Sequence, residues 1–303
     1  MLHPALGSAR AAAALPAATS ADLQQVARAY ADVPLGDRTL VLQPLCDALP
    51  RDAVRRWTYD APGEALPWAV LGAQTADAAG EARGGDLAAN TPEDRMLAFQ
   101  RLMADARTHL MRSVELDDRD PGPWYQLLST CYAIGNQALQ ADLAELRSRS
   151  PFDVEGLRLA LDLLGEKWFG EPGEARSLAE DISATAPDGS EAHVVTAFLL
   201  RDEWFYTHRF QDDARSANRV LQSPQSRRAL HDAMDRSVRS ASHVPTETTL
   251  LVRNHFAHVA SLAGDDAAAK EQFDALAGTV TRWPWALFGD PVEGYAAARR
   301  QAS

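Results

Sequence analysis

Apolar residues recur along this chain at the spacing that places them on one face of a helix. The longest such stripe consists of Met96, Phe99, Met103, Ala106, Leu110 and Val114. Shorter stripes occupy residues 139–146 and 251–262, and each has to be buried against a neighbouring helix. The best candidate for a strand, residues 36–45, contains Pro44, which a central strand does not tolerate. The pattern therefore predicts an all-α protein.

Helix start and stop signals divide this pattern into segments. Asp153 and the pair Thr91-Pro92 are typical of helix N-termini, and Gly135 is typical of a helix end. The predicted helices are 20–32, 38–48, 65–83, 93–116, 123–134, 138–149, 153–165, 173–185, 190–206, 226–242, 246–263, 266–277 and 291–301. Short connections between them predict antiparallel hairpins, and the longest irregular connection is expected at about 207–225.

Three parts are expected along the chain: a flexible N-terminus over 1–19, a helical hairpin region over 20–62 and a longer helical array over 63–303. The Ala-rich stretch of the first part is interrupted by Pro16 and is too weakly apolar for a secretory signal peptide. No stretch reaches the roughly 18 uninterrupted apolar residues of a membrane span. We therefore expect neither a signal peptide nor a membrane partner.

An internal repeat determines the expected architecture. Pro121, Pro151 and Pro187 are separated by 30 and 36 residues, close to the period of about 34 of a two-helix repeat. The segments 121–151 and 250–281 share a pattern of packing positions. These are Trp124, Leu127, Leu128, Cys131, Gly135, Leu139, Leu143, Leu146 and Pro151 in the first, and Phe256, Ala257, Ala260, Gly264, Ala269, Phe273 and Leu276 in the second.

At these positions the chain resembles the tetratricopeptide repeat (TPR) family, with the match running over about 65–280 and loosest over 151–245. The resemblance implies a right-handed α-solenoid of antiparallel helix hairpins, preceded by an N-terminal helical extension; a generic helical bundle is the alternative. Near the chain end, Trp283, Trp285 and Phe288 have the composition of an aromatic cap over the last apolar face. A peptide-docking aromatic site is the other interpretation.

A second resemblance rests on one helix and one junction. The helix contains Trp68, Gly72-Ala73 and Ala82-Arg83-Gly84, and the junction is Asp118-Arg119-Asp120-Pro121-Gly122-Pro123-Trp124. These features are similar to those of a group of bacterial TPR-like proteins. This second resemblance implies a fold and no activity.

Charge and cysteine content exclude several classes of partner. Acidic residues outnumber basic ones by 42 to 30, for a net charge of −12. Nucleic acids and anionic membranes bind clustered positive charge, so neither is expected as a partner. The two cysteines, Cys46 and Cys131, are too few for a disulfide-stapled secreted domain. Both are interpreted as small buried residues, and the protein is expected in the cytoplasm.

Candidate chemistry along the chain is sparse. His255 and His258 are one helical turn apart, but no further ligand stands near them in the sequence, so no metal is expected. The carboxylate runs at 117–120, 202–203 and 212–213 are interpreted as solvated faces or turns. Because the motifs of nucleotide, hydrolase and calcium sites are absent from the sequence, we expect a protein that is not an enzyme and has no cofactor.

An aromatic segment offers a second type of site. It contains Trp204, Phe205, Tyr206, His208 and Phe210 among charged residues. Such a segment is typical either of a pocket wall or of an aromatic plug beneath a loop. A pocket near Trp204 and Tyr206 would favour a small-molecule-sensing regulator or an all-α enzyme.

The TPR resemblance implies a concave face made by the first helix of each repeat. When the inward-facing positions of the family are transferred to this sequence, that face consists of Tyr125, Ser129, Tyr132, Glu155, Asp162, Asn254, His258 and Ser261. One TPR subclass holds a C-terminal carboxylate with Lys and Asn side chains, and this chain lacks the lysines. We therefore expect a noncatalytic protein–protein interaction scaffold that binds a basic or amphipathic segment of a protein or peptide partner.

Overall fold

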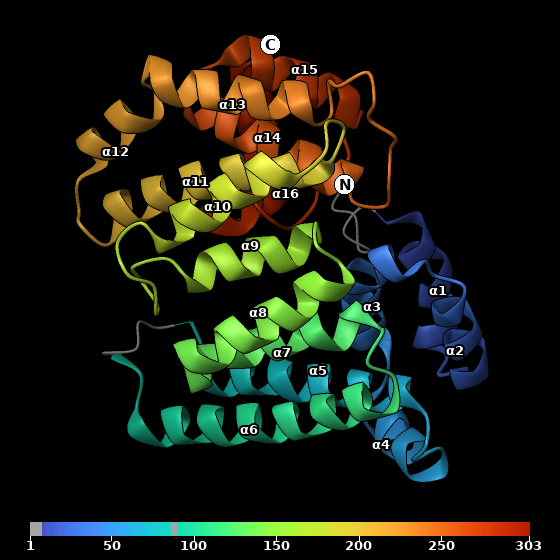
Figure 1. The fold of residues 1–303 in the computed structure, drawn as a ribbon. Helices are drawn as coiled ribbons and strands as arrows, with labels where there is room; N and C mark the ends of the chain where they lie inside the picture. The colour runs from blue at the N-terminus through green and yellow to red at the C-terminus, as the bar shows by residue number, and fades with distance from the viewer. Residues whose placement is uncertain (1–7, 86–89) are drawn as a thin grey trace. The chain divides into compact units, whose positions relative to one another are not determined.

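A computed structural model describes residues 8–85 and 90–303, and this part of the chain is helical and contains no β-strand (Figure 1). The prediction of an all-α protein is therefore confirmed. The chain divides into an N-terminal unit, Arg10–Gly156, and a C-terminal unit, Leu157–Ser303, to which Ser8 and Ala9 also belong. The boundary expected from the sequence lay at residue 63. Within the N-terminal unit, α3 and α4 pack against α5.

The helices of the N-terminal unit are α1 (Ala9–Thr19), α2 (Leu23–Ala31), η1 (Leu35–Asp37), α3 (Arg38–Ala48), α4 (Arg51–Asp60), α5 (Ala65–Arg83), α6 (Glu93–Leu116), α7 (Pro121–Ile134) and α8 (Asn136–Arg149). The helix α9 (Val154–Leu163) crosses the boundary. The C-terminal unit continues with α10 (Glu174–Thr185), η3 (Glu191–Val194), α11 (Val195–Arg209), α12 (Ala214–Leu221), α13 (Pro224–Arg236), α14 (Thr249–Leu262), α15 (Asp266–Leu276), η4 (Trp285–Phe288) and α16 (Pro291–Gln301).

Three helices were not predicted: α1, α4 and α12. The segment 1–19 was expected to be flexible, but α1 occupies Ala9–Thr19, where alanine favours the helix and Ala11, Ala14, Ala17 and Ala18 form a buried face. Residues 1–7 lie outside the part that the structure describes. The prediction of an irregular connection over 207–225 is wrong, because Asp213 caps α12 by accepting a hydrogen bond from the Ser216 N–H.

The core of the N-terminal unit forms where α5 packs along α6 and α7 packs along α8. The predicted stripe on α6 is buried at Phe99, Met103, Ala106, Leu110 and Val114. Over 121–151 the predicted anchors with larger apolar side chains, from Trp124 to Leu146, are buried as well, whereas Pro151 is exposed. These burials confirm that the 3.6-residue spacing marked core positions.

Buried carboxylates join helices that are distant in sequence within this unit. Asp120 accepts hydrogen bonds from the Gly122 N–H at the start of α7, from the Tyr30 hydroxyl and from Arg38. Asp153, at the start of α9, accepts from the Gly156 N–H and from the Thr39 hydroxyl. Each carboxylate therefore caps one helix and also holds a side chain from another element.

The C-terminal unit is organised around α11 and α14. The helix α11 contacts α10, α12, α13 and α14, and α14 packs along α15. Of the anchors predicted over 250–281, Gly264 is exposed and the others are buried. Glu191 of η3 is also buried; it accepts hydrogen bonds from the hydroxyl groups of Thr246, Thr248 and Thr249, and its Oε1 lies 3.0 Å from His243 Nε2. This carboxylate fixes the connection between α13 and α14 against η3.

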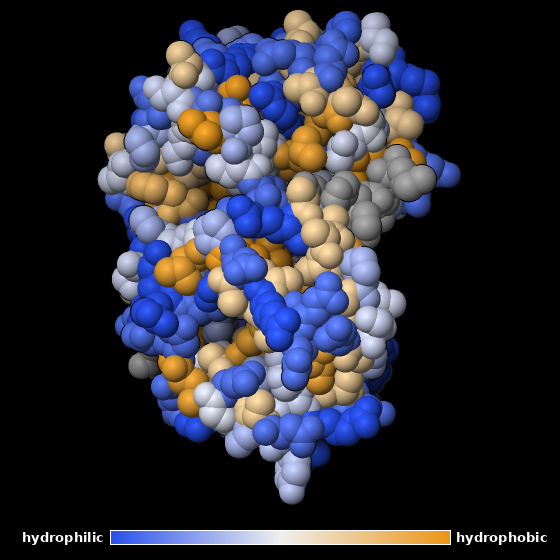
Figure 2. All heavy atoms as spheres, turned by 90° about the vertical axis from the view of Figure 1, so that its right-hand side faces the viewer, coloured by the Kyte–Doolittle hydropathy of each residue, from blue (hydrophilic) through white to orange (hydrophobic). Residues whose placement is uncertain are grey.

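The last segment of the chain packs on α14 and α15 through Trp285. This side chain is 5% exposed, and its Nε1–H donates to Asn254 Oδ1 at 2.7 Å. Its rings lie 5.8 Å from Phe273 and 5.3 Å from Tyr295, centroid to centroid. Elsewhere on the molecule, apolar side chains are scattered among polar ones on the face that Figure 2 shows.

Candidate functional site

Three of the predicted concave-face residues lie on α7 in the N-terminal unit. Tyr125, Ser129 and Tyr132 are half-buried, and the Ser129 hydroxyl donates to the Gln126 carbonyl at 2.6 Å. Their spacing places the three on one side of the helix. Glu155 of α9 is withdrawn from solvent, with 8% of the residue exposed. A ligand on this unit would therefore meet the α7 side chains and not Glu155.

Three more predicted residues lie on α14, where two of them are buried. Asn254 is fully buried against Trp285, and His258, 6% exposed, places its ring edge-on to the same indole at 5.0 Å. The prediction that Asn254 and His258 line an accessible groove does not fit this burial. The reason is tertiary, because the segment that follows α15 covers the face of α14 on which they lie. Ser261 is half-buried, and its hydroxyl donates to the Ala257 carbonyl.

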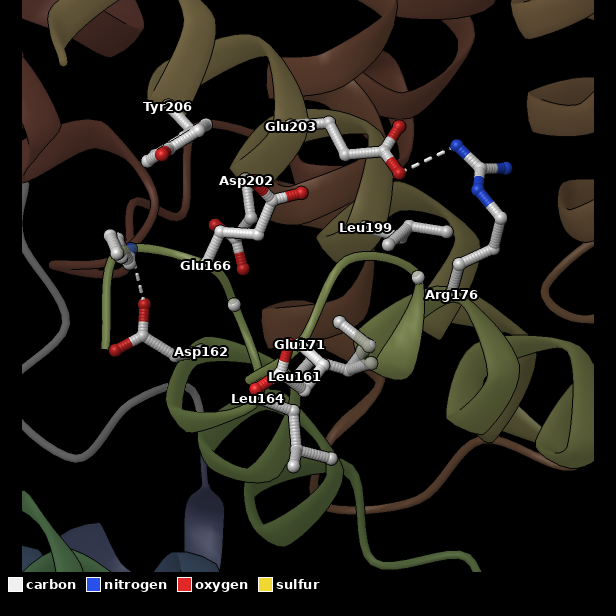
Figure 3. Close-up of a pocket in the computed structure, with 14 residues that line it drawn as sticks. Leu161, Asp162, Leu164, Glu166, Glu171, Arg176, Leu199, Asp202, Glu203 and Tyr206 are labelled. Atoms are coloured by element: carbon white, nitrogen blue, oxygen red, sulfur yellow. Dashed lines mark hydrogen bonds and ion pairs between the residues drawn. The ribbon is translucent and has the colours of Figure 1, made fainter. Parts of the chain in front are cut away.

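The eighth predicted residue, Asp162, lines a cavity within the C-terminal unit. This first cavity has a volume of about 70 Å³ and opens between the end of α9, the loop 164–173, the start of α10 and one side of α11 (Figure 3). Its lining consists of Leu161, Asp162, Leu164, Gly165, Glu166, Lys167, Glu171, Gly173, Ala175, Arg176, Leu199, Asp202, Glu203 and Tyr206. The lining therefore combines leucines with a ring of charged side chains.

The loop 164–173 owes its shape to a close approach of backbone to backbone. A Cβ atom placed on Gly170 would stand 1.7 Å from the Leu164 carbonyl oxygen, so only glycine fits there. The Trp168 N–H donates to the Gly165 carbonyl and the Phe169 N–H to the Leu163 carbonyl. These turns present Glu166 and Lys167 at the edge of the cavity.

Acidic groups dominate the first cavity. Lys167 forms an ion pair with Asp162 at 2.5 Å, and Arg176 forms one with Glu203 at 2.5 Å. The carboxylates of the lining are Asp162, Glu166, Glu171, Asp202 and Glu203, and its cations are Lys167 and Arg176. Because both cations are already paired, the cavity retains an excess of negative charge that would attract a cation.

Asp202 connects the cavity to the interior of the unit. It accepts hydrogen bonds from Arg201 Nε and Nη2 at 2.9 and 2.8 Å, both through Oδ1. Its second oxygen, Oδ2, is buried and has no hydrogen-bond partner among the described residues. Arg201 in turn contacts His255 Nδ1 at 3.2 Å. A polar chain thus runs from the cavity to α14, with an unused acceptor on Asp202.

Burial affects the neighbouring carboxylate, Glu203. Desolvation raises the pKa of Glu203, and the nearby Arg176 guanidinium opposes this shift. The negative charges of Asp202 and Glu166 raise its pKa further. Bringing a cation into the cavity would relieve this repulsion among the carboxylates.

A second cavity of about 250 Å³ adjoins the first, between α11 and α12. Its lining consists of Glu166, Leu200, Glu203, Trp204, Tyr206, Thr207, Gln211, Ala217, Val220 and Leu221. The Trp204 Nε1–H donates to Asn218 Oδ1 at 2.8 Å, which ties α12 to α11. This cavity exists because α12 replaces the irregular connection that the sequence had suggested.

The aromatic segment contributes to both cavities. Tyr206 lines the two of them, and its ring stacks on Phe210 at 5.8 Å. The ring centroids of Phe205 and Phe210 are 6.1 Å apart. The Lys167 ammonium lies over the Phe205 ring, 5.5 Å from its centroid. Trp204 is 7% exposed and also packs into the interior. The segment therefore combines the pocket wall and the packing role that the sequence had left as alternatives.

Two sequence candidates for chemistry are placed in the interior. His255 is fully buried and His258 nearly so; burial lowers the pKa of both rings, that of His258 to about 3. Within residues 8–85 and 90–303, no three His, Cys, Asp or Glu side chains gather as metal ligands would. Cys46 and Cys131 are free thiols and both are buried, as predicted.

Several lining residues were missed in the sequence. Asp202 and Glu203 were interpreted as a solvated run, and Glu166, Lys167 and Arg176 were not singled out. The one signal that could have found them is the stretch 165–173, where glycines bracket a charged pair, Glu166-Lys167, followed by an aromatic pair, Trp168-Phe169. That stretch does not reveal which side of α11 it faces.

No helix in the described part of the chain combines the length and the apolar character needed to cross a bilayer. Comparison with protein-family models, with curated proteins and with solved structures finds no match to this chain.

Proposed function

We propose that this chain is a noncatalytic protein–protein interaction scaffold that binds a basic or amphipathic segment of its partner at the first cavity. The observation that carries this proposal is the lining of that cavity, with five carboxylates and two cations around leucine side chains. A basic side chain gains electrostatic attraction at such a site, and the leucines accept its methylene groups.

The scaffold is proposed to be a right-handed TPR-like α-solenoid. The hairpins α7–α8 and α14–α15 support this, because the aromatic, aliphatic and cysteine side chains at their anchor positions are buried. The chain end is proposed as an aromatic cap. The burial of Trp285 supports the cap, whereas Trp283 is 42% exposed and the side chain of Phe288 lies outside the described part.

The proposed binding surface differs from the one implied by the resemblance. Asn254 and His258 are buried, so the α14 wall is not part of it. Asp162 is retained, because it lines the first cavity. The surface is therefore assigned to α9, the loop 164–173 and α11.

Photo-crosslinking tests this function directly. Tyr206 is replaced by p-benzoylphenylalanine, which keeps an aromatic ring at the cavity, and Tyr59, which is 86% exposed on the N-terminal unit, receives the same change as a control. Two labelled peptides are compared: an amphipathic Arg/Leu peptide and its Glu/Leu counterpart. We expect crosslinks from position 206 to the basic peptide alone. Crosslinks to the acidic peptide alone, or to neither, would contradict the proposal.

The second cavity favours one further candidate function, a small-molecule-sensing regulator. Its volume of about 250 Å³ and its Trp204 wall support this alternative. A ligand present at one hundred times its dissociation constant stabilises the folded chain by about 2.7 kcal/mol. A thermal-shift screen of small amines and aromatic compounds tests it, with Val220→Trp as the variant that fills the cavity. A stabilising compound whose effect survives that substitution does not bind there.

A further inference from the structure

The two cavities have three lining residues in common, so they lie side by side. Glu166, Glu203 and Tyr206 belong to both linings. A ligand that spans both cavities would therefore pass over these three residues. The shared residues include two carboxylates and one aromatic ring.

The chemistry of the site changes from one cavity to the other. The carboxylates Asp162, Glu171 and Asp202 line only the first cavity. The second has apolar side chains from Leu200, Trp204, Ala217, Val220 and Leu221, beside the uncharged polar side chains of Thr207 and Gln211. Of these, Val220 is 59% exposed, so it is accessible to a ligand. A cation thus fits the first cavity, and an apolar group fits the second.

Two carboxylates are available to an incoming cation. Asp202 Oδ2 is buried without a hydrogen-bond partner among the described residues, and Figure 3 shows Asp202 extending from α11 toward the loop that carries Glu166. Glu166 is exposed, and none of the described residues forms an ion pair with it. Asp202 is paired with Arg201 through its other oxygen, Oδ1, and Glu203 is paired with Arg176. A cation would therefore bind between Glu166 and Asp202, beside the Tyr206 ring.

We infer that the pair of cavities receives an extended partner segment in which an arginine is followed, two residues later, by a large apolar residue. This inference rests on the proposed function and specifies its ligand. Arginine fits better than lysine, because its planar guanidinium pairs with two carboxylate oxygens at once and stacks on aromatic rings. In an extended chain, residues two apart point to the same side about 7 Å from each other, so one segment presents both side chains to the same face of the protein.

Selection from a random peptide library tests the motif without knowledge of the partner. The full chain is immobilised and exposed to phage-displayed heptapeptides. We expect enrichment of Arg-x-Leu, Arg-x-Ile or Arg-x-Phe. The enriched peptide is then synthesised together with two altered forms, one with citrulline in place of arginine and one with alanine in place of the apolar residue.

Double-mutant cycles then locate each half of the peptide. Glu166→Gln and Val220→Ser alter exposed residues of the first and second cavity, so the fold is expected to be retained. Glu180→Gln and Val244→Ser are matched exposed controls outside both linings. We expect Glu166→Gln and citrulline each to weaken binding roughly fivefold, and their combination to weaken it no further.

The outcomes separate this inference from the proposed function. Coupling of Glu166 to the arginine and of Val220 to the apolar residue supports the two-part site. Peptides that bind and crosslink to position 206 without either coupling, or with lysine preferred to arginine, overturn the two-part site and leave the proposed function standing. Failure of every peptide to bind overturns both.

Discussion

Gly72 of α5 lies against Leu110 of α6 so closely that a Cβ atom at position 72 would stand 2.5 Å from the Leu110 Cγ. The same atom would stand 3.1 Å from the Ala106 carbonyl oxygen. The missing side chain is therefore what allows the two longest helices of the N-terminal unit to pack along each other.

Gly72→Ala is expected to destabilise the chain. Overpacking of a core costs about 1–3 kcal/mol, and the better helix propensity of alanine returns about 1 kcal/mol of that. We expect the free energy of unfolding to decrease by about 1 kcal/mol, which is measured as a lower midpoint of thermal denaturation. Gly80→Ala is the matched control, because it lies on the same helix and no atom approaches its Cβ position within 4 Å. That variant should be at least as stable as the original chain, and equal losses in both would disprove the packing explanation.

Gly170→Ala is expected to abolish peptide binding with a smaller effect on the rest of the fold. The new Cβ would clash with the Leu164 carbonyl, so the loop that presents Glu166 and Lys167 must rearrange. We expect at least a tenfold loss of affinity for the basic peptide, measured by fluorescence anisotropy, while the far-ultraviolet circular dichroism is retained. Gly63→Ala is a loop control with no atom within 4 Å of the added carbon. Unchanged binding by the Gly170 variant would show that loop shape does not matter.

Trp285→Phe is expected to lower the free energy of unfolding by about 2–4 kcal/mol. The change removes part of a buried ring and leaves Asn254 Oδ1 without its 2.7 Å donor. Trp283→Phe tests the neighbouring tryptophan, which is 42% exposed, and its effect should stay within about 0.5 kcal/mol. Both are measured by thermal denaturation. Similar small losses at the two positions would argue against an anchoring role for Trp285.

The buried histidines are expected to make the C-terminal unit sensitive to acid. The pKa of His258 falls from its usual 6.5 to about 3 in the folded chain, because burial disfavours the charged ring and Arg201 repels it. Between pH 6.5 and 3 the unfolded chain therefore binds a proton that the folded chain does not. The free energy of unfolding therefore keeps its full value above pH 6.5 and decreases as the pH falls. For one histidine the decrease is about 2 kcal/mol at pH 5.

Denaturation at pH 7.5 and pH 5 measures this loss, and His258→Gln should reduce it. Asp153 of the N-terminal unit acts in the opposite direction, because burial raises its pKa to about 6 and the folded chain binds that proton first. Acidification therefore stabilises the folded chain through Asp153, and Asp153→Asn removes this stabilisation. The free energy of unfolding should then fall more steeply with acidification in Asp153→Asn and less steeply in His258→Gln. A His258 variant with the original pH dependence would contradict the assignment.

The sequence by itself determined the helices and their buried faces. The spacing of 3.6 residues identified the stripe on α6 and the anchors around Trp124 and Phe273. It could do so because the period of a helix is a local property, which can be read directly from the order of the residues. Local signals also located the N-cap at Asp153 and the aromatic segment at Trp204 and Tyr206.

Only the tertiary structure decided which of these faces remain accessible. Asn254 has the sequence position of a groove residue, but a segment about thirty residues further along, with Trp285, covers it. Asp202 and Glu203 have the pattern of a solvated run, and they line a cavity because the loop 164–173 folds opposite them. The burial of a residue and the position of a cavity depend on contacts between segments that are distant in the sequence. Such contacts produce no periodic pattern of residues from which they could be predicted.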